Sequence, residues 1–441
     1  MCSSDLQYPV IRFDFSAIGH EVVSELRQGI FDRLEQLSRE YKVDLSGQQT
    51  FTGKFQELII QLSKINKVVI LVDEYDKPIL DHIDDIEEAK AQREVLKSLY
   101  SVIKSSDSYI RFVLLTGVSK FARTSIFSGL NNLEEISLDL EYATFLGYTE
   151  DELKKYFAQH IEILAKHVTK SIEVVIGELR NYYDGYVFAR DSVPVFNPYS
   201  ILSSLKKKEL ANYWFAAGTP TFLIKLVRKN NYDVDTITHP VINKANLDTF
   251  EPDDIVLPAL LLQTGYLTIK AYDSVTSNYT LGIPNREVND GLTVQLTDAF
   301  TGLQANKSIQ YAKRIFDKFV SGDMIKLQQV LQEFFNKMPY TVHIKSESQL
   351  QFVLYAIFAL IGVTVDPEVV TSLGRADLVV SLPKLVYVIE LKFNGSAAAA
   401  LAQIQDKKYY EKYDNTGKHI TLVCINFDEP TKTVSLESCG I

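Results

Sequence analysis

Two acidic residues and one lysine stand at the ends of two apolar segments near the C-terminus of this 441-residue chain. Asp377 begins the first segment, and Glu390 and Lys392 end the second. Residues two apart in a strand point the same way, so Glu390 and Lys392 are predicted to share a face. Two carboxylates and an ammonium group at a strand end can hold a divalent cation and a water for phosphodiester hydrolysis. Charged strand ends are also common on ordinary surfaces, and spacing alone leaves that interpretation open.

A β-hairpin is predicted to bring these three residues together. The apolar runs 378–382 and 385–391 flank Pro383-Lys384, which is the pattern of two strands joined by a tight turn. Such a hairpin can place Asp377 beside the end of the second strand.

Two helices are predicted around the hairpin. Residues 396–408 have helical composition and place Gln403 one to two turns into a helix. Residues 346–361, which contain Glu347, are predicted to form a helix that packs against the sheet. The predicted order is therefore helix, hairpin, helix.

A second acidic pair ends an apolar segment in the N-terminal half. Residues 67–72 are almost wholly apolar and are followed by Asp73 and Glu74, which is the form of a Walker B motif. In such a motif the Asp binds Mg²⁺ and the Glu polarises the attacking water. Thr116 ends another predicted strand, where a residue that contacts the γ-phosphate would lie. Buried strands often end in exposed acids, and a terminal Thr is often structural, so both interpretations remain open.

Composition excludes several classes of protein. The three cysteines lack metal-ligand spacing and fit a reducing cytoplasm better than a disulfide framework. The longest apolar run, 352–365, is too short to span a bilayer, so no membrane association is expected. The net charge of −10 argues against broad electrostatic binding of nucleic acid but leaves room for a locally basic channel.

The chain changes character along its length. Apolar strands alternate with helices in the N-terminal part, which predicts an α/β fold with a parallel sheet. The segments are strands 8–15, 67–72, 110–116 and 136–140 and helices 21–41, 55–63 and 87–105. The middle is mostly helical, with predicted helices 150–166, 172–183, 200–205 and 221–229 and a possible strand pair, 261–269 and 279–283. Two more helices are expected within 309–335.

Several short segments together resemble a bacterial family that pairs an AAA-ATPase-like domain with a C-terminal PD-(D/E)XK nuclease domain. The C-terminal matches are Gly374-Arg375-Ala376-Asp377, Glu390-Leu391-Lys392, Gln403-Ile404 and Lys408-Tyr409. The others include Asp73-Glu74-Tyr75-Asp76-Lys77-Pro78, Leu115-Thr116-Gly117-Val118-Ser119-Lys120-Phe121, Tyr182-Tyr183-Asp184-Gly185-Tyr186, Phe196-Asn197-Pro198-Tyr199-Ser200 and Gln263-Thr264-Gly265-Tyr266. The resemblance runs from about Tyr8 to about Tyr413.

The resemblance implies a catalytic set of Asp377, Glu390, Lys392, Gln403 and Glu347. Asp377 and Glu390 would ligate Mg²⁺ or Mn²⁺, and the substrate would be nucleic acid, with DNA ahead of RNA. Asp73, Glu74 and Thr116 would form part of the binding site for Mg²⁺ and ATP in the intact family. The alternative is a non-catalytic NTPase-type regulatory or nucleic-acid-binding module with a degenerate nuclease fold.

One departure from the family is the phosphate-binding loop. No G-x-x-x-x-G-K-[ST] motif occurs, and at the nearest candidate, Gly53-Lys54, Phe55 stands in place of the hydroxyl residue. We expect the chain to begin after the loop, with residues 1–6 an artefact resembling a sequencing adapter. ATP binding and ATPase activity should then be poor. The strand at 110–116 should lack a neighbour and expose unpaired backbone.

The sequence thus predicts three regions. They are an AAA-ATPase-like domain without its phosphate-binding loop (1–148), a mostly helical lid or linker (149–305) and a PD-(D/E)XK nuclease-like α/β domain (306–441).

Overall fold

The structure, a computed structural model, is of mixed α/β class, with a parallel sheet in the N-terminal part, a helical middle and a mixed sheet in the C-terminal part. It describes residues 7–119, 126, 132–214, 237–247, 255–339, 344–361, 363–370 and 375–441. The predicted helix 221–229 lies outside these residues. Contacts divide the chain into two units, Met1–Ala143 with Phe188–Asp191 and Val241–Thr280, and Thr144–Val187 with Ser192–Pro240 and Leu281–Ile441. The three-region division remains a prediction.

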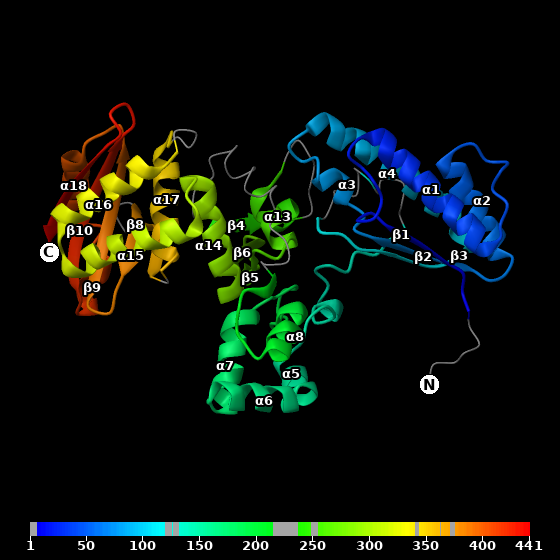
Figure 1. Cartoon of the computed structure of the whole chain (residues 1–441), viewed down its shortest axis with the longest axis horizontal. Helices are drawn as coiled ribbons and strands as arrows, with labels where there is room; N and C mark the ends of the chain where they lie inside the picture. Colours follow the sequence, from blue (N-terminus) through cyan, green and yellow to red (C-terminus); the bar gives the residue numbers. More distant parts are fainter. Residues whose placement is uncertain are drawn as a thin grey trace. The chain divides into compact units, whose positions relative to one another are not determined.

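A three-stranded parallel sheet forms the centre of the first unit (Figure 1). Its order is β1 (Val10–Asp14), β2 (Val68–Asp73) and β3 (Ile110–Leu115), close to the predicted ranges. The helices that surround it are α1 (Val23–Tyr41), α2 (Phe51–Ser63), α3 (Lys77–Leu80) and α4 (Ile86–Ser105). Alternate residues of β2 are fully or nearly fully buried, as expected of a strand whose one face packs on helices.

β3 forms an edge of this sheet, as the sequence predicts. Phe112 is 52% exposed and Leu114 is 39% exposed, which is unusual for apolar side chains of a parallel sheet. Gly53-Lys54, the nearest candidate for a phosphate-binding loop, lies within α2 instead. The Lys54 ammonium is buried there, 2.6 Å from Glu35 and 2.9 Å from the Leu45 carbonyl oxygen.

Two predictions of strands in this unit are wrong in whole or part. Residues 136–140 form no strand, because the Asp139 side chain accepts a hydrogen bond from the Glu141 amide at 2.9 Å and starts a 3₁₀ turn. The predicted strand 261–269 is split between α13 (Leu257–Gln263) and β5 (Thr268–Asp273). β5 joins a small sheet of order β4-β6-β5, with β4 at Val241–Asn243 and β6 at Asn278–Gly282.

Helices dominate the start of the second unit. They are α5 (Glu150–Tyr156), α6 (Ala158–Val168), α7 (Ile172–Tyr183), α8 (Pro198–Lys207) and α14 (Arg286–Thr301). The single predicted helix 150–166 is two helices, because the chain leaves helical geometry at Phe157. Thr149 caps α5 and forms a capping box with Glu152. Buried side chains of α5 to α8, among them Leu164 and Tyr183, form one core.

The C-terminal part of this unit is a five-stranded sheet between helices. The elements are α15 (Ala305–Ser321), α16 (Met324–Lys337), α17 (Glu347–Ala359), β7 (Thr364–Val370), β8 (Arg375–Ser381), β9 (Leu385–Phe393), α18 (Ala397–Asp406), β10 (His419–Asp428) and β11 (Thr433–Gly440). The order is β11-β10-β9-β8-β7, and only β9 and β10 run parallel. The predicted helix–hairpin–helix is confirmed as α17, β8–β9 and α18.

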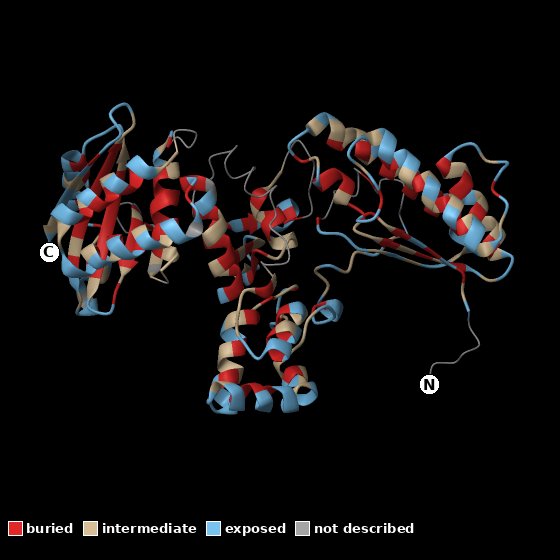
Figure 2. Cartoon of the chain, viewed as in Figure 1, coloured by how far each residue is buried: buried red, intermediate tan, exposed pale blue. Residues whose placement is uncertain are grey.

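The two faces of β9 pack on different helices. Tyr387 donates a hydrogen bond to the Phe319 carbonyl oxygen of α15, whereas Val386 and Val388 pack with Ile404 of α18. Figure 2 shows the resulting band of buried residues along the central strands. Even-numbered residues of β9, including Glu390 and Lys392, therefore belong to the α18 face.

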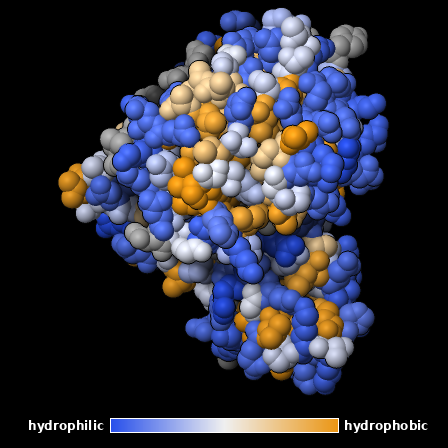
Figure 3. Space-filling model, turned by 90° about the vertical axis from the view of Figure 1, so that its left-hand side faces the viewer, coloured by the Kyte–Doolittle hydropathy of each residue, from blue (hydrophilic) through white to orange (hydrophobic). Residues whose placement is uncertain are grey.

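The surface is mixed in character. Figure 3 shows a largely hydrophilic face with hydrophobic side chains gathered near its middle. No helix within the described part of the chain has the length and apolarity needed to cross a membrane.

Candidate functional site

The β8–β9 hairpin places Asp377 beside Glu390. The two strands pair from Leu378 with Ile389 onward, so Asp377 and Glu390 lie one step beyond the end of the ladder. The strands are held together at that step by a side chain: Asp377 Oδ2 accepts a hydrogen bond from the Leu391 amide at 2.7 Å. This contact fixes the Asp377 carboxylate over the end of β9.

Glu390 is the buried centre of the cluster, with only 3% of its surface exposed. Its Oε1 accepts hydrogen bonds from Lys392 Nζ at 3.0 Å and from Gln403 Nε2 at 2.9 Å. Gln403 comes from α18, which the Ser396 side chain caps through the Ala399 amide. Gln403 therefore ties the helix to the strand and orients the Glu390 carboxylate.

Glu347, which precedes the hairpin in the chain, completes the set. It lies in the first turn of α17, and its Oε1 is 3.7 Å from Lys392 Nζ. All five predicted residues are thus brought together. Sequence reasoning missed Gln351, whose amide donates to the Asp377 carbonyl oxygen at 2.7 Å. Its spacing of four residues from Glu347 places both on one helix face and was the available signal.

The charges of the cluster perturb one another. Burial, followed by the negative charge of Glu390, raises the pKa of Asp377 to about 7, although the Leu391 amide acts against this. Burial opposes the charge of Lys392, but the hydrogen bond and charge of Glu390 outweigh it and raise the pKa of the ammonium group. Cys424, opposite Glu390 on β10, stays a thiol because burial and Glu390 raise its pKa to about 12.

The donor set fits a hard divalent cation held by few protein ligands. No three His, Cys, Asp or Glu side chains among the described residues converge as a metal site. The Lys392 ammonium lies between the carboxylates of Glu390 and Glu347 and supplies the positive charge there. Mg²⁺ binds through one or two carboxylates and keeps several waters, so Asp377 and Glu390 suffice in type and number.

The predicted Walker B residues also find partners. Asp73 ends β2, and its Oδ1 accepts a hydrogen bond from Thr116 Oγ1 at 2.7 Å. Arg12 Nη2 lies 3.3 Å from Asp73 Oδ2 and 3.2 Å from Asp14 Oδ2. Sequence reasoning missed Arg12 and Asp14, although parallel neighbours end at one edge and Asp14 is the register partner of Asp73.

The residues after Asp73 differ in role. Burial raises the pKa of Glu74, whose backbone has a φ of 51°, a left-handed conformation uncommon outside glycine. Asp76 is fully buried and accepts hydrogen bonds from the Ser119 hydroxyl at 2.6 Å and the Val118 amide at 3.1 Å. Asp76 therefore anchors the loop after β3, and Glu74 is the more accessible of the two carboxylates.

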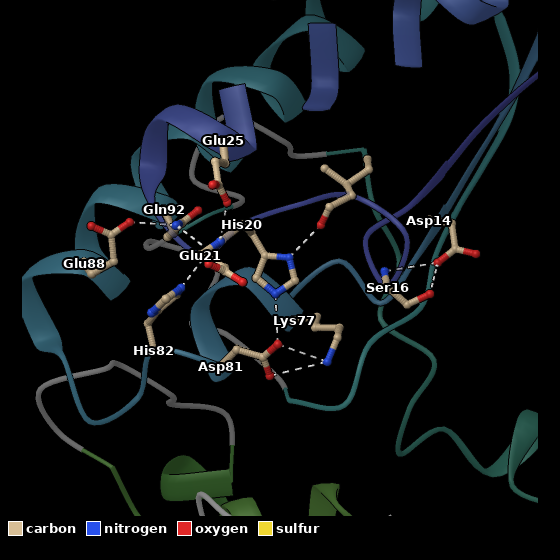
Figure 4. Close-up of polar contacts among 11 residues, drawn as sticks. Asp14, Ser16, His20, Glu21, Glu25, Lys77, Asp81, His82, Glu88 and Gln92 are labelled. Carbon is tan, nitrogen blue, oxygen red and sulfur yellow. Dashed lines mark hydrogen bonds and ion pairs between the residues drawn. The ribbon is translucent and has the colours of Figure 1, made fainter. Parts of the chain in front are cut away.

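A charged cluster lies near this edge of the sheet (Figure 4). His20 Nε2 is 2.9 Å from Asp81 Oδ2, and His20 Nδ1 is 2.7 Å from the Ile18 carbonyl oxygen. Both neighbours are acceptors, so they favour the imidazolium form of the ring, in which both nitrogens donate. The hydrogen bond to Asp81 accordingly raises the pKa of His20, and Lys77 pairs with the same carboxylate at 3.0 Å.

Comparison with known proteins matches both ends of the chain. Residues 2–127 match the family described as predicted AAA-ATPase, and residues 345–437 match the PD-(D/E)XK nuclease superfamily. The chain is 34% identical to "Uncharacterized protein in vnfD 5'region" of Azotobacter chroococcum mcd 1, over 97% of this chain and 82% of that protein. No solved structure matches. The second matched region contains Glu347, Asp377, Glu390, Lys392 and Gln403.

Proposed function

This chain belongs to the family that joins a predicted AAA-ATPase domain to a PD-(D/E)XK nuclease superfamily domain, and from that premise we propose that its C-terminal domain hydrolyses phosphodiester bonds in nucleic acid. The observation that carries the proposal is the convergence of Asp377, Glu390 and Lys392 at one strand end. Domains of this superfamily generally use divalent metal ions, and the donor set described above fits one. DNA is the proposed substrate and Mg²⁺ the proposed cation, with Mn²⁺ as the substitute.

Each residue has a role that its contacts support. Asp377 and Glu390 would hold the cation, which when bound polarises the phosphate and lowers the pKa of a water. Lys392 would orient that water and offset the negative charge that develops on the phosphate. Gln403 would keep Glu390 and Lys392 in place through its hydrogen bond to Oε1. Glu347 would balance the charge of Lys392 when no substrate is present.

A second candidate is a non-catalytic module with the same fold that binds nucleic acid or regulates a partner. The observation in its favour is that Lys392 already forms ion pairs with both Glu390 and Glu347. Under this candidate the cluster would be a structural ion-pair network rather than a cation site.

The two candidates are separated by nicking of supercoiled plasmid DNA with Mg²⁺ or Mn²⁺. The wild-type chain is compared with Asp377→Ala and Lys392→Ala, and Lys384→Ala at the other end of the hairpin serves as the control. We expect both site variants to lose at least about 100-fold in rate and the control to keep the wild-type rate. Equal rates in all four proteins, or a folded wild-type chain without activity, would favour the second candidate.

A further inference from the structure

A pocket of about 600 Å³ lies in the second unit, between the end of α7 and the start of α14. The last turn of α7 contributes Arg180 and Asn181, and the first turns of α14 contribute Arg286 and Asn289. Asp184, just after α7, forms part of the wall. The nuclease-like cluster contributes no residue to this pocket.

The pocket is built on a fixed junction of two loops. Gly185 has a φ of 96°, and a Cβ atom there would lie 2.4 Å from the Pro284 carbonyl oxygen, so only glycine fits. Asn285 donates to the Asp184 carbonyl oxygen at 2.8 Å and caps α14 by accepting from the Val288 amide at 3.1 Å. The loop that follows α7 and the loop that precedes α14 are therefore held together.

Two arginines line one side of the pocket. Arg180 donates to Glu150 from Nε at 2.8 Å and from Nη2 at 2.7 Å, which orients its guanidinium group. Arg286 is 3.3 Å from Asp290 and lies over the Tyr182 ring at 4.7 Å. Each guanidinium keeps further N–H donors, and the N-terminus of α14 adds partial positive charge. Two guanidinium groups beside a helix N-terminus suit a phosphate group.

The other side offers the amide groups of two asparagines and one buried carboxylate oxygen. Asp184 is 7% exposed, and its Oδ1 has no hydrogen-bond partner within the described residues. Such a buried oxygen is costly unless a ligand or water donates to it. The Asn181 and Asn289 amides add one acceptor and two donors each. This set suits a group that both donates and accepts hydrogen bonds, such as a nucleobase edge or a ribose.

We propose that this pocket binds one nucleotide, with its phosphate on Arg180 and Arg286 and its base or ribose on Asp184, Asn181 and Asn289. Glu150 and Asp290 already offset part of the positive charge, so a monophosphate fits better than a polyphosphate. The volume lies within the range of small-molecule sites. The nucleotide could be a free monophosphate or one residue of a single strand, and the proposal does not depend on nuclease activity.

The test is calorimetric titration of the full chain in metal-free buffer. The probes are AMP, GMP, CMP and UMP, a short single-stranded DNA of mixed sequence, and inorganic phosphate. The variants are Arg286→Gln and Asn289→Ala. Arg314→Gln is a matched control, because Arg314 is 46% exposed against 52% for Arg286, pairs with Glu333 and lies over the Tyr311 ring.

We expect at least one monophosphate or the strand to bind, and Arg286→Gln and Asn289→Ala each to weaken that binding by about tenfold or more. The Arg314→Gln variant should bind like the wild type. Tighter binding of the strand than of monophosphates would identify a strand contact, and the reverse a small-molecule site. The proposal is overturned if neither the strand nor any of the monophosphates binds, or if Arg286→Gln and Asn289→Ala bind like the Arg314→Gln control. It is also overturned if inorganic phosphate binds as tightly as every nucleotide.

Discussion

At the scale of single residues, the charges of the cluster on β8 and β9 partly compensate one another without a metal ion. Asp377 has a pKa of about 7, and Lys392 is charged beside Glu390. A dication would replace a proton on Asp377 and compete with the Lys392 ammonium for Glu390. The same groups that stabilise the metal-free cluster would then set the conditions under which metal binds.

Mg²⁺ affinity should therefore depend on pH through Asp377. The pKa of this carboxyl is raised, so below pH 7 its proton must leave before the metal binds. We expect the Mg²⁺ affinity to fall by about tenfold for each pH unit below 7 and to level off above it. Calorimetry at pH 5.5, 6.5 and 8, in buffers of different ionisation enthalpy, measures both the affinity and the proton release. A pH-independent affinity would contradict the role of Asp377 as a ligand.

Gln403 should matter for catalysis more than for stability. Its amide holds Glu390 Oε1 at 2.9 Å and lies 3.4 Å from the Tyr409 hydroxyl. We expect Gln403→Ala to lower the nicking rate by about 10- to 100-fold, as removal of groups that position metal ligands does. Gln405→Ala, an exposed glutamine of the same helix, is the control. If Gln403→Ala lowered the melting temperature markedly, and the rate fell only in step with the loss of folded protein, Gln403 would have a structural role instead.

At the scale of secondary structure, the charged His20–Asp81 pair connects the loop after β1 to the end of α3. The pKa of His20 is raised in the folded chain, so folding takes up protons near neutral pH. The stability from this pair is fully present below the unfolded pKa of His, about 6.5. It is lost as the pH rises through the higher folded pKa.

A double-mutant cycle of His20→Gln and Asp81→Asn measures this contribution to the free energy of unfolding. Asp81 is 45% exposed, so solvent screening limits the coupling to about 1 kcal/mol at pH 6. We expect the coupling to be clearly smaller at pH 9. The charged neighbour Lys77 is unchanged in all four proteins, so its effect on Asp81 cancels in part. A coupling that is equal at both values of pH would show that His20 does not carry the charge.

Helices and strands with a clear local sequence pattern were predictable, whereas features that depend on contacts with distant segments were not. The hairpin of β8 and β9 was found because apolar runs flank Pro383-Lys384, and α7 because its apolar period is regular. β10 and β11 gave no comparable hypothesis, although they extend the sheet beside β9. The strand proposed at 136–140 failed because a turn bond of Asp139 is invisible in apolar periodicity. Arg12 was missed because its contacts to Asp14 and Asp73 appear only once β1 and β2 are paired.

At the scale of the whole chain, the two ends differ in how complete their chemistry is. The nuclease-like cluster has two carboxylates, an ammonium and an orienting amide within one hydrogen-bonded group. The edge of the N-terminal sheet has Asp73, Glu74 and Thr116, but the 441 residues contain no G-x-x-x-x-G-K-[ST] motif to cradle phosphates. The cytoplasmic location predicted from cysteine usage remains a prediction.

Catalysis by this polypeptide should therefore be independent of ATP. Asp73 is held by Thr116 and Arg12, and without a phosphate-binding loop the remaining groups offer a nucleotide triphosphate few contacts. We expect no micromolar binding of ATP by calorimetry, and nicking rates that change by less than about twofold on adding ATP or on Asp73→Ala. Asp377→Ala should abolish nicking in the same assay, which would show that the assay reads the C-terminal site. If ATP bound with micromolar affinity and Asp73→Ala removed that binding, the N-terminal unit would supply a complete nucleotide site by contacts other than this loop.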